Sequence, residues 1–387
     1  MGICGIIAEY DPFHKGHLYH LSQARKLTDA DAVVCVMSGS FTQRGSPALL
    51  PAHIRAEMAL LCGADIVLQL PYAFSVREAE AFALGGVFIL QALGCVTHLA
   101  FGCECACLPL LSRAAALLEA PDDALNAALR AGLNGGLSHA AALGRALDER
   151  LGLAPGLLSA PNTALAIAYL RALLRLSSPI QPVVIPREGK YHAEELGAFP
   201  SASAVRAALL RGDWAGVTQA IPPQALPPLR RAVSAGEMCP PNALDTALRR
   251  ALLLASPQAM AALPGVSEGL EKRILRAAET AVTRQELIAR IKTRRYTQGR
   301  ISRALCHALL AVGREDLPAL PGYARVLGFR KSARPLLRRM QKCGFPLVCR
   351  PAREAALALD IRADEMWRIG AGLPRGDTYL RPPVILP

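Results

Sequence analysis

Five short apolar runs in the first half of the chain, separated by helical patterns, constrain the fold most. The runs are rich in β-branched residues and lie at 2–9, 32–37, 65–70, 95–101 and 181–186. Stretches with helical spacing lie near 17–28, 51–62, 76–93 and 108–119. Strands that alternate with helices predict a parallel sheet with crossover helices. We therefore expect a Rossmann-like α/β fold that binds ligands at the carboxyl ends of its strands.

The segment EYDPFHKGHLYH, residues 9–20, follows the first of these runs. Pro12 disfavours a helical conformation in the residue before it, and the apolar spacing becomes helical after Gly16. His14 and His17 therefore lie where a strand gives way to a helix N-terminus, whose free N–H groups attract anions. Imidazoles in that position donate hydrogen bonds to phosphate oxygens. We interpret both histidines as catalytic; the simpler alternative is a solvated or capping histidine.

Polar residues also follow the other predicted strands, whose carboxyl ends meet at the same edge of the sheet. Each of them alone is explained by a helix cap or a surface charge. Together they predict the rim of a nucleotide site. They are Arg44 in MSGSFTQRG, Gly102 in FGCE, Asn162, Arg187, and Ser201, Ser203 and Arg206 in SASAVR.

The two halves of the chain differ strongly in net charge. Residues 1–200 carry 14 Lys and Arg against 17 Asp and Glu, a net charge of −3, whereas residues 201–387 carry 30 against 14, a net charge of +16. A basic half suits a polyanionic partner. The stretch KTRRYTQGRISR (292–303) interleaves cations with an aromatic ring, which suits RNA phosphates and a stacked base; a solvated helix face is the alternative. Its candidate RNA-binding residues are Lys292, Arg294, Arg295, Tyr296, Arg300 and Arg303.

The composition favours a cytoplasmic protein that does not enter a membrane. The uncharged stretch 81–103 contains four glycines and divides at Gly94 into a helix and a strand. No basic segment of the kind that begins a signal peptide is present at the start. Eleven cysteines, an odd number, suit a reducing compartment better than a disulfide framework. Because Cys103, Cys105 and Cys107 lack the C-x-x-C spacing of structural zinc sites, we expect buried thiols rather than a metal site.

A resemblance makes the prediction more specific. H-x-G-H after the first strand and S-x-S-x-x-R later resemble the nucleotidyltransferase superfamily. Across essentially the whole chain, the sequence is similar to the bacterial tRNA(Met) cytidine acetate ligases. The similar stretches, in order, are EYDPFHKGHLYH, MSGSFTQRGSPA, GADIVLQLPYAF, FGCE, SAPNTALAIAYL, SASAVR and KTRRYTQGRISRALCHALL.

The chain departs from that family at three positions. Asp11 stands where the family prefers Asn, Gln69 where it prefers Glu, and Cys103 where it prefers Ser. Asp11 matters most, because a carboxylate near phosphates weakens nucleotide binding unless a cation such as Lys15 pairs with it.

The pattern along the chain predicts three parts, and the resemblance implies what each of them does. Residues 1–211 would be the nucleotidyltransferase domain for ATP and acetate, with a helical insertion at about 120–176. Residues 212–242, with three Pro-Pro pairs, would be a join. Residues 243–387 would form a basic, mainly α-helical tRNA-binding domain.

The resemblance also implies the reaction and its site. Acetate would be activated by ATP as acetyl-adenylate and transferred to N4 of the wobble cytidine of elongator tRNA(Met). A magnesium ion on the phosphates is expected, although no dedicated carboxylate cage is apparent. The implied ATP-binding residues are Ile7, Ala8, Glu9, Tyr10, Asp11, Pro12, Phe13, His14, Lys15, Gly16, His17, Leu18, Tyr19, His20, Gly102, Asn162 and Arg187, with Ser201, Ser203 and Arg206 at the phosphate end.

Two alternative functions stay open at this point. An adenylyltransferase that makes a dinucleotide coenzyme would share the front half, but it has no use for the 145 residues from 243 onward. A tRNA-binding protein without enzymatic activity would not need His14, Gly16 and His17. The sequence does not indicate an oligomeric state.

Overall fold

The five apolar runs become five neighbouring strands of one sheet in the computed structural model, which describes every residue except 1, 154–155, 159, 188–200, 375 and 377–378. The strands in the described residues are β1 (Ile3–Ala8), β2 (Ala32–Ser38), β3 (Ile66–Leu70), β4 (His98–Cys103), β5 (Gln181–Pro186), β6 (Ala324–Arg330), β7 (Leu347–Val348) and β8 (Val384–Leu386). Their order is β5-β4-β1-β2-β3-β6-β7, with β8 paired to β6. The first five strands are parallel, as predicted.

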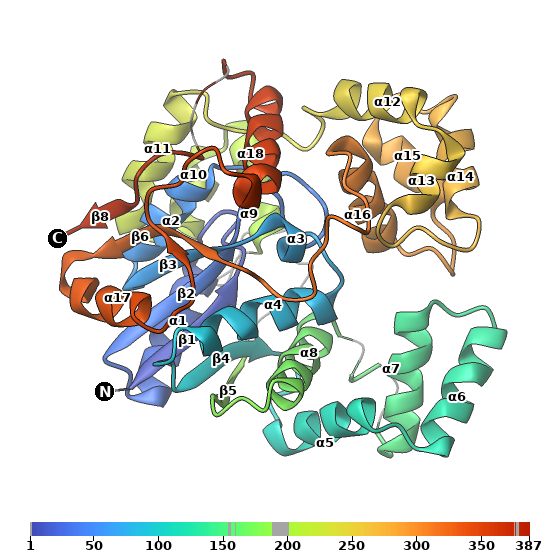
Figure 1. Cartoon of the computed structure of the whole chain (residues 1–387), viewed down its shortest axis with the longest axis horizontal. Helices are drawn as coiled ribbons and strands as arrows, with labels where there is room; N and C mark the ends of the chain where they lie inside the picture. The colour runs from blue at the N-terminus through green and yellow to red at the C-terminus, as the bar shows by residue number, and fades with distance from the viewer. Residues whose placement is uncertain (1, 154–155, 159, 188–200, 375, 377–378) are drawn as a thin grey trace.

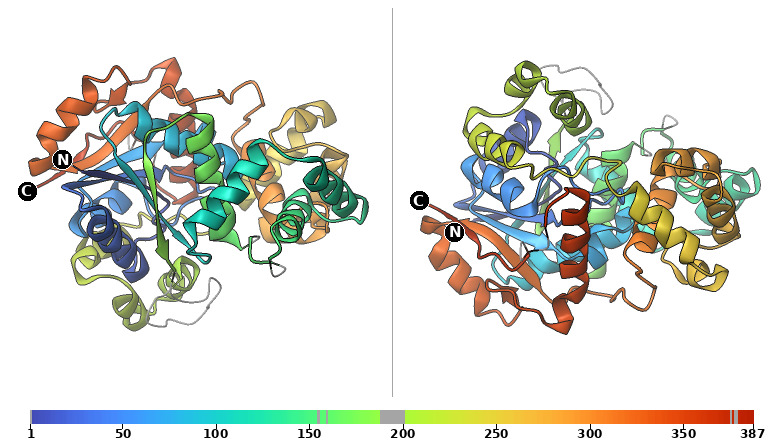
Figure 2. Two further views of the ribbon diagram at one scale, coloured as in Figure 1. Left: turned by 90° about the horizontal axis from the view of Figure 1, so that it is seen from below. Right: turned by 90° about the horizontal axis from the view of Figure 1, so that it is seen from above.

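Helices cover both faces of this sheet (Figure 2). Successive strand residues point to opposite faces, so Ile3 and Val34 belong to one buried cluster and Cys4 and Val33 to the other. The first cluster packs against α4 (Ala79–Ala92), α5 (Leu108–Glu119), α8 (Pro161–Arg175) and α17 (Arg334–Gln341). The second packs against α1 (Lys15–Thr28), α2 (Ala52–Leu61), α9 (Ala202–Arg211), α10 (Trp214–Ala220) and α11 (Leu226–Ser234).

The remaining elements lie around this core (Figure 1). Two antiparallel helices, α6 (Asp123–Asn134) and α7 (His139–Arg150), extend the chain between α5 and α8. Two further helices of the sheet region are α3 (Tyr72–Ser75) and α18 (Ala358–Gly370). Short 3-10 turns occupy 223–225, 331–333 and 355–357. Among the described helices, none has both the length and the apolar character that a membrane span requires.

A separate helical unit, defined here as residues 245–309, has its own apolar core. It consists of α12 (Asp245–Leu254), α13 (Pro257–Ala262), α14 (Leu270–Ala278), α15 (Arg284–Ile291) and α16 (Gln298–Leu309). Figure 1 shows these helices gathered beside the sheet rather than on one of its faces. The helices expected after residue 243 are therefore present up to Leu309.

Beyond Leu309 the chain contains strands as well as helices, which the sequence did not indicate. Residues 324–330 return to the sheet as β6, which pairs antiparallel with β3, with Ile66 opposite Phe329. This pairing covers a strand edge that would otherwise be exposed. The run ARVLGFR is interrupted by a glycine and two arginines and shows no clear strand pattern, so only the long-range contact with β3 reveals it. The domain boundaries themselves stay a prediction.

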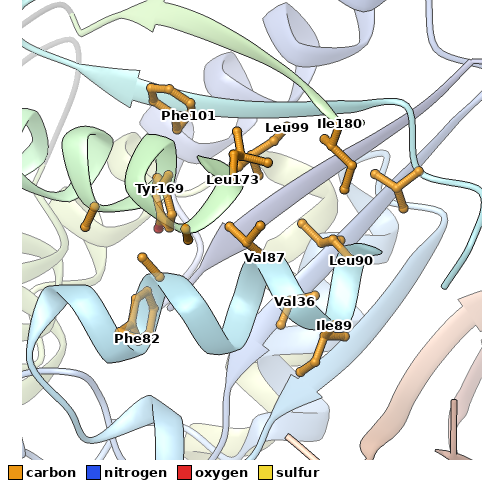
Figure 3. Packing of buried hydrophobic residues seen from close by; sticks show 14 of the residues in the cluster. Val36, Phe82, Val87, Ile89, Leu90, Leu99, Phe101, Tyr169, Leu173 and Ile180 are labelled. Atoms are coloured by element: carbon orange, nitrogen blue, oxygen red, sulfur yellow. The ribbon is translucent and has the colours of Figure 1, made fainter. Parts of the chain in front are cut away.

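Two glycines allow α4 to approach β1 closely, and this contact places the strand that leads into residues 9–20. A Cβ atom on Gly5 would lie 2.6 Å from Leu90 Cδ1, and one on Gly86 would lie 2.6 Å from Ile7 Cδ1. Figure 3 shows Leu90 and Val87 of α4 facing the sheet. The position of the carboxyl end of β1 therefore depends on the absence of side chains here.

We expect Gly86→Val to lower the free energy of unfolding by about 1–3 kcal/mol, because the added methyl groups collide with Ile7. Ala140→Val, at an exposed position of α7, is the matched control. Urea denaturation followed by circular dichroism measures both. Equal stabilities of the two variants would contradict the close packing described here.

Candidate active site

A cavity of about 580 Å³ opens at the carboxyl ends of β1, β4 and β5. It gathers most of the residues that the sequence implicates in ATP binding. Those that line it are Ile7, Ala8, Glu9, Tyr10, Asp11, His14, Gly16, His17, Tyr19, His20, Gly102, Asn162, Arg187, Ser201, Ser203 and Arg206. The other four implicated residues, Pro12, Phe13, Lys15 and Leu18, are not part of the lining: Phe13 is fully buried in the core and Lys15 is exposed.

His14 and His17 form a capping box at the N-terminus of helix α1. His14 is the N-cap, and its Nδ1 accepts a hydrogen bond from the Gly16 N–H at 3.1 Å. The Nδ1 of His17 accepts one from the His14 N–H at 3.3 Å. The two rings stack with centroids 3.8 Å apart. Because each Nδ1 is an acceptor, the proton of each neutral imidazole resides on Nε2, which is then a hydrogen-bond donor.

Burial keeps these histidines neutral at pH 7. It lowers the pKa of His14 to about 3, helped by the positive charges of Arg187 and Arg206. Burial also lowers the pKa of His17 far below its ordinary value, with further contributions from His14 and Arg187. The pKa of His20 falls to about 4 for the same reasons, burial and Arg187. Three neutral imidazoles beside two arginines form a site that is ready to accept anionic phosphates.

Asp11 is paired, but with a different cation from the one expected. Its Oδ1 accepts a hydrogen bond from the Leu49 N–H at 2.7 Å. Arg206 Nη1 donates to the Asp11 carbonyl oxygen at 2.6 Å and lies 3.4 Å from Asp11 Oδ2. The prediction that Lys15 neutralises Asp11 was therefore wrong, because Lys15 is exposed on the first turn of α1.

On the side of the cavity formed by α8, the Glu104 carboxylate fixes the positions of Asn162 and Thr163 through hydrogen bonds. This carboxylate lies at the N-terminus of α8, where Oε2 accepts from the Thr163 N–H at 2.8 Å and Oε1 accepts from Asn162 Nδ2. Asn162 Oδ1 in turn accepts from Arg187 Nη1 at 3.2 Å. Although burial alone would raise it, the hydrogen bonds from Asn162 and Thr163 hold the pKa of Glu104 below its usual value. Asn162 and Arg187 therefore act as one connected pair.

The serines of SASAVR have a structural role as well as a place in the lining. Ser201 is the N-cap of α9, accepting from the Ala204 N–H at 3.1 Å, and its hydroxyl lies 2.9 Å from that of Ser203. The capping alternative is therefore correct for Ser201. Both serines still line the cavity near Arg206.

Sequence reasoning missed two features of the site. Arg55 is fully buried and donates hydrogen bonds to the carbonyl oxygens of Leu50, Glu9 and Gly39. An arginine that follows Ile54 in a stretch with helical apolar spacing, PAHIRAEMALL, was the signal that could have revealed it. The second feature is the hairpin at 41–47, which places Gln43 in the lining beside Arg44, a residue that the sequence already placed at the rim.

The candidate tRNA-binding residues lie outside this cavity and differ in exposure. Lys292, Arg294 and Arg295 are exposed. The ring of Tyr296 is buried: it is 6% exposed, and its hydroxyl donates to the Glu268 carbonyl oxygen. The structure contradicts the stacking role expected for Tyr296, since the ring belongs to the core of the helical unit.

The other two cations in this set are held by neighbouring groups. Arg300 donates to the Gly265 carbonyl oxygen at 2.8 Å and to Ser267 Oγ at 2.7 Å. Arg303 lies largely buried next to Glu78, and burial lowers its pKa. Lys292 and Arg294 are therefore the better candidates for contact with a polyanion.

Stability should depend on pH through His14. In the unfolded chain its pKa is about 6.5, so below that pH the unfolded state binds a proton that the folded state excludes. Stability is then fully present above pH 6.5 and is lost as pH falls, by about 1.4 kcal/mol per pH unit for each such histidine. His14→Asn removes one of these groups and keeps a good N-cap.

We expect the stability of the wild type to decrease more steeply than that of His14→Asn between pH 6.5 and 5. Urea denaturation of both proteins at pH 7.5, 6 and 5 measures the difference. Parallel pH dependences would contradict the neutral state assigned to His14.

Comparisons with known proteins agree with this geometry. The family model of the HIGH nucleotidyl transferases matches residues 1–375. A tRNA(Met) cytidine acetate ligase of Syntrophomonas wolfei is 38% identical over 352 residues, 88% of this chain and 85% of that protein. One of Acetivibrio thermocellus is 37% identical over 398 residues, 95% of this chain and 94% of that protein.

Solved structures extend the similarity to the whole fold. Apo Thermotoga maritima TmcAL superimposes with a TM-score of 0.92 at 29% identity, and a form of it bound with alpha-thio ATP superimposes with a TM-score of 0.90 at 30% identity. Both matches cover 100% of each chain. The predicted family is therefore confirmed: the chain belongs to the HIGH nucleotidyl transferases and, within them, to the tRNA(Met) cytidine acetate ligase family.

Proposed function

We propose that this protein is an ATP-dependent tRNA(Met) cytidine acetate ligase, which activates acetate as acetyl-adenylate and acetylates N4 of the wobble cytidine of elongator tRNA(Met). The observation that carries the proposal is the neutral His14–His17 pair at the N-terminus of α1, inside a cavity of a nucleotidyl transferase fold. Relatives that match nearly the whole chain carry this enzyme name. Neither alternative weighed from the sequence has an observation in its favour.

In the first step, a carboxylate oxygen of acetate attacks the α-phosphorus of ATP, and pyrophosphate leaves. No protein nucleophile is required, so the protein aligns the reactants and stabilises charge on the phosphate oxygens. The Nε2–H groups of His14 and His17 are the proposed donors. Arg187 and Arg206 supply positive charge at the two sides of the cavity.

In the second step, the exocyclic amine of cytidine attacks the acetyl carbonyl carbon. A C–N bond forms as the bond from that carbon to the AMP oxygen breaks, AMP leaves, and the amine releases a proton to solvent. Nothing in this step needs a covalent enzyme intermediate.

Magnesium is expected on the phosphates rather than in a protein cage. Among the described residues, the carboxylates in the cavity lining are Glu9 and Asp11, and both already accept backbone hydrogen bonds, from Gln43 at 2.6 Å and from Leu49 at 2.7 Å. Mg²⁺ commonly binds through substrate phosphates, with water completing its shell. The donor set fits an ion carried in by ATP, and ATP with this ion would then supply the electrophilic phosphorus.

The helical unit is the proposed tRNA-binding surface. Lys292 and Arg294 are exposed at the turn before α16, whereas Arg295 is paired with Glu268 at 2.8 Å. A tRNA phosphate would have to compete with Glu268 for Arg295. The strongest contribution is therefore expected from Lys292 and Arg294.

We expect His17→Ala to lower acetate-dependent pyrophosphate release from ATP by at least tenfold, because a transition-state donor worth about 1.4 kcal/mol or more is lost. His139→Ala, at an exposed position of α7, is the control. Circular dichroism verifies that both variants fold. A His17→Ala enzyme as active as the control would remove the basis of the active-site assignment.

Replacing Lys292 and Arg294 together by Ala should weaken tRNA binding. It should also reduce the slope of log affinity against log salt by roughly 0.7–0.9 for each phosphate that is no longer neutralised. Adenylate formation without tRNA should stay unchanged, since neither residue lines the cavity. The control is Arg113→Ala with Arg130→Ala, two exposed positions in the near-neutral half. Titrations of tRNA binding at several salt concentrations measure the slope. An unaltered slope would rule out this surface as the tRNA-binding site.

A further inference from the structure

One side of the cavity is formed by residues outside the proposed ATP set. The hairpin 41–47 contributes five lining residues, Thr42, Gln43, Arg44, Ser46 and Pro47. Its ends are joined by a bridge between Phe41 and Pro47, and the Gly45 N–H donates to the Thr42 carbonyl oxygen at 2.8 Å. The Gln43 N–H donates to Glu9 Oε1 at 2.6 Å, which ties the hairpin to the end of β1.

The outer side of the same hairpin contacts the helical unit. Arg284, at the start of α15, donates hydrogen bonds to the carbonyl oxygens of Gly45 and Ser302. Gly45 has φ +71°, and a Cβ atom there would lie 2.7 Å from the backbone nitrogen of Arg303. The tip of the hairpin is therefore in backbone contact with α16, at a position that suits only glycine.

The base of the hairpin is attached elsewhere. Ser40 Oγ donates to Asp364 Oδ1 at 2.9 Å, and Trp367 Nε1 donates to the Ala48 carbonyl oxygen at 2.6 Å. Both partners belong to α18. Loss of the Arg284 contact should therefore release the tip and leave the base in place.

These contacts put the hairpin between the two proposed substrate sites. Its inner side lines the cavity, and its tip contacts residues of α16 that follow the basic turn 292–297 within two helical turns. We expect an RNA held by that turn to lie near the tip of the hairpin, because the tip contacts the helix that follows the turn. The amide of Gln43 and the guanidinium of Arg44 carry the donors that the O2 and N3 acceptors of a cytosine require.

We propose that the hairpin 41–47 is the wall of the cavity that receives the target cytosine, and that Arg284 is a positioning residue that holds this wall against the helical unit. This inference rests on the proposed function. It separates the second step from the first, because no hairpin residue except Arg44 was assigned to the nucleotide site from the sequence. Disturbing the tip should therefore slow acetyl transfer more than adenylate formation.

The test compares Arg284→Met with Gly45→Ala, which disturbs the same contact from the hairpin. Arg290→Met is the matched control, since Arg290 lies on the same helix and its Nη1 donates to Thr280 Oγ1 instead. Three quantities are measured: pyrophosphate release without tRNA, acetyl transfer at saturating tRNA, and tRNA affinity. Arg284→Lys tests for rescue, because one ammonium donor can replace part of the contact.

We expect acetyl transfer to fall at least tenfold in Arg284→Met and Gly45→Ala, with pyrophosphate release and tRNA affinity within twofold of the wild type, and to recover in part in Arg284→Lys. Three outcomes would each overturn the inference. They are equal losses of acetyl transfer and pyrophosphate release, unchanged acetyl transfer, and a loss of acetyl transfer that weaker tRNA binding explains. These outcomes leave the proposed function intact. A wild-type protein that releases no pyrophosphate would instead contradict the proposed function, and the inference would fall with it.

Discussion

The buried guanidinium of Arg55 joins the chain segments on which the cavity depends. It donates to the Glu9 carbonyl oxygen at 2.6 Å, to the Leu50 carbonyl oxygen at 3.1 Å, and to the carbonyl oxygen of Gly39. Glu9 begins the histidine segment, and Gly39 begins the loop that carries the hairpin 41–47. A hydrogen bond to a charged group typically contributes about 1.5–3 kcal/mol. The three bonds of this one side chain therefore fix the positions of both walls of the site.

The polar groups of the cavity have different electrostatic roles. The histidines are neutral because they are buried beside arginines, and backbone N–H groups occupy their Nδ1 atoms. They contribute directed hydrogen bonds, whereas Arg187 and Arg206 contribute charge. Asp11, which replaces the Asn preferred in the family, is balanced by Arg206, so a carboxylate near the proposed phosphate site is not an uncompensated negative charge.

The sequence predicted the features that depend on local patterns. The period of the apolar residues revealed β1 to β5 and their helices, and the position of His14 and His17 after a strand predicted a cavity that both of them line. What it missed depends on contacts between distant segments: Arg206 pairs with a residue 195 positions away, and β6 joins the sheet beside β3. Tyr296 was misinterpreted because a basic turn with an aromatic residue has the same composition whether the ring is exposed or, as here, buried.

The most direct test of the account is a single reaction series with the purified protein, ATP and acetate, with and without tRNA(Met). Pyrophosphate release is followed in time, and the recovered tRNA is digested and analysed by mass spectrometry. The account predicts acetate-dependent pyrophosphate release without tRNA, and a gain of one acetyl group on the wobble cytidine when tRNA is present. Release that does not depend on acetate, or a tRNA of unchanged mass after ATP is consumed, would contradict it.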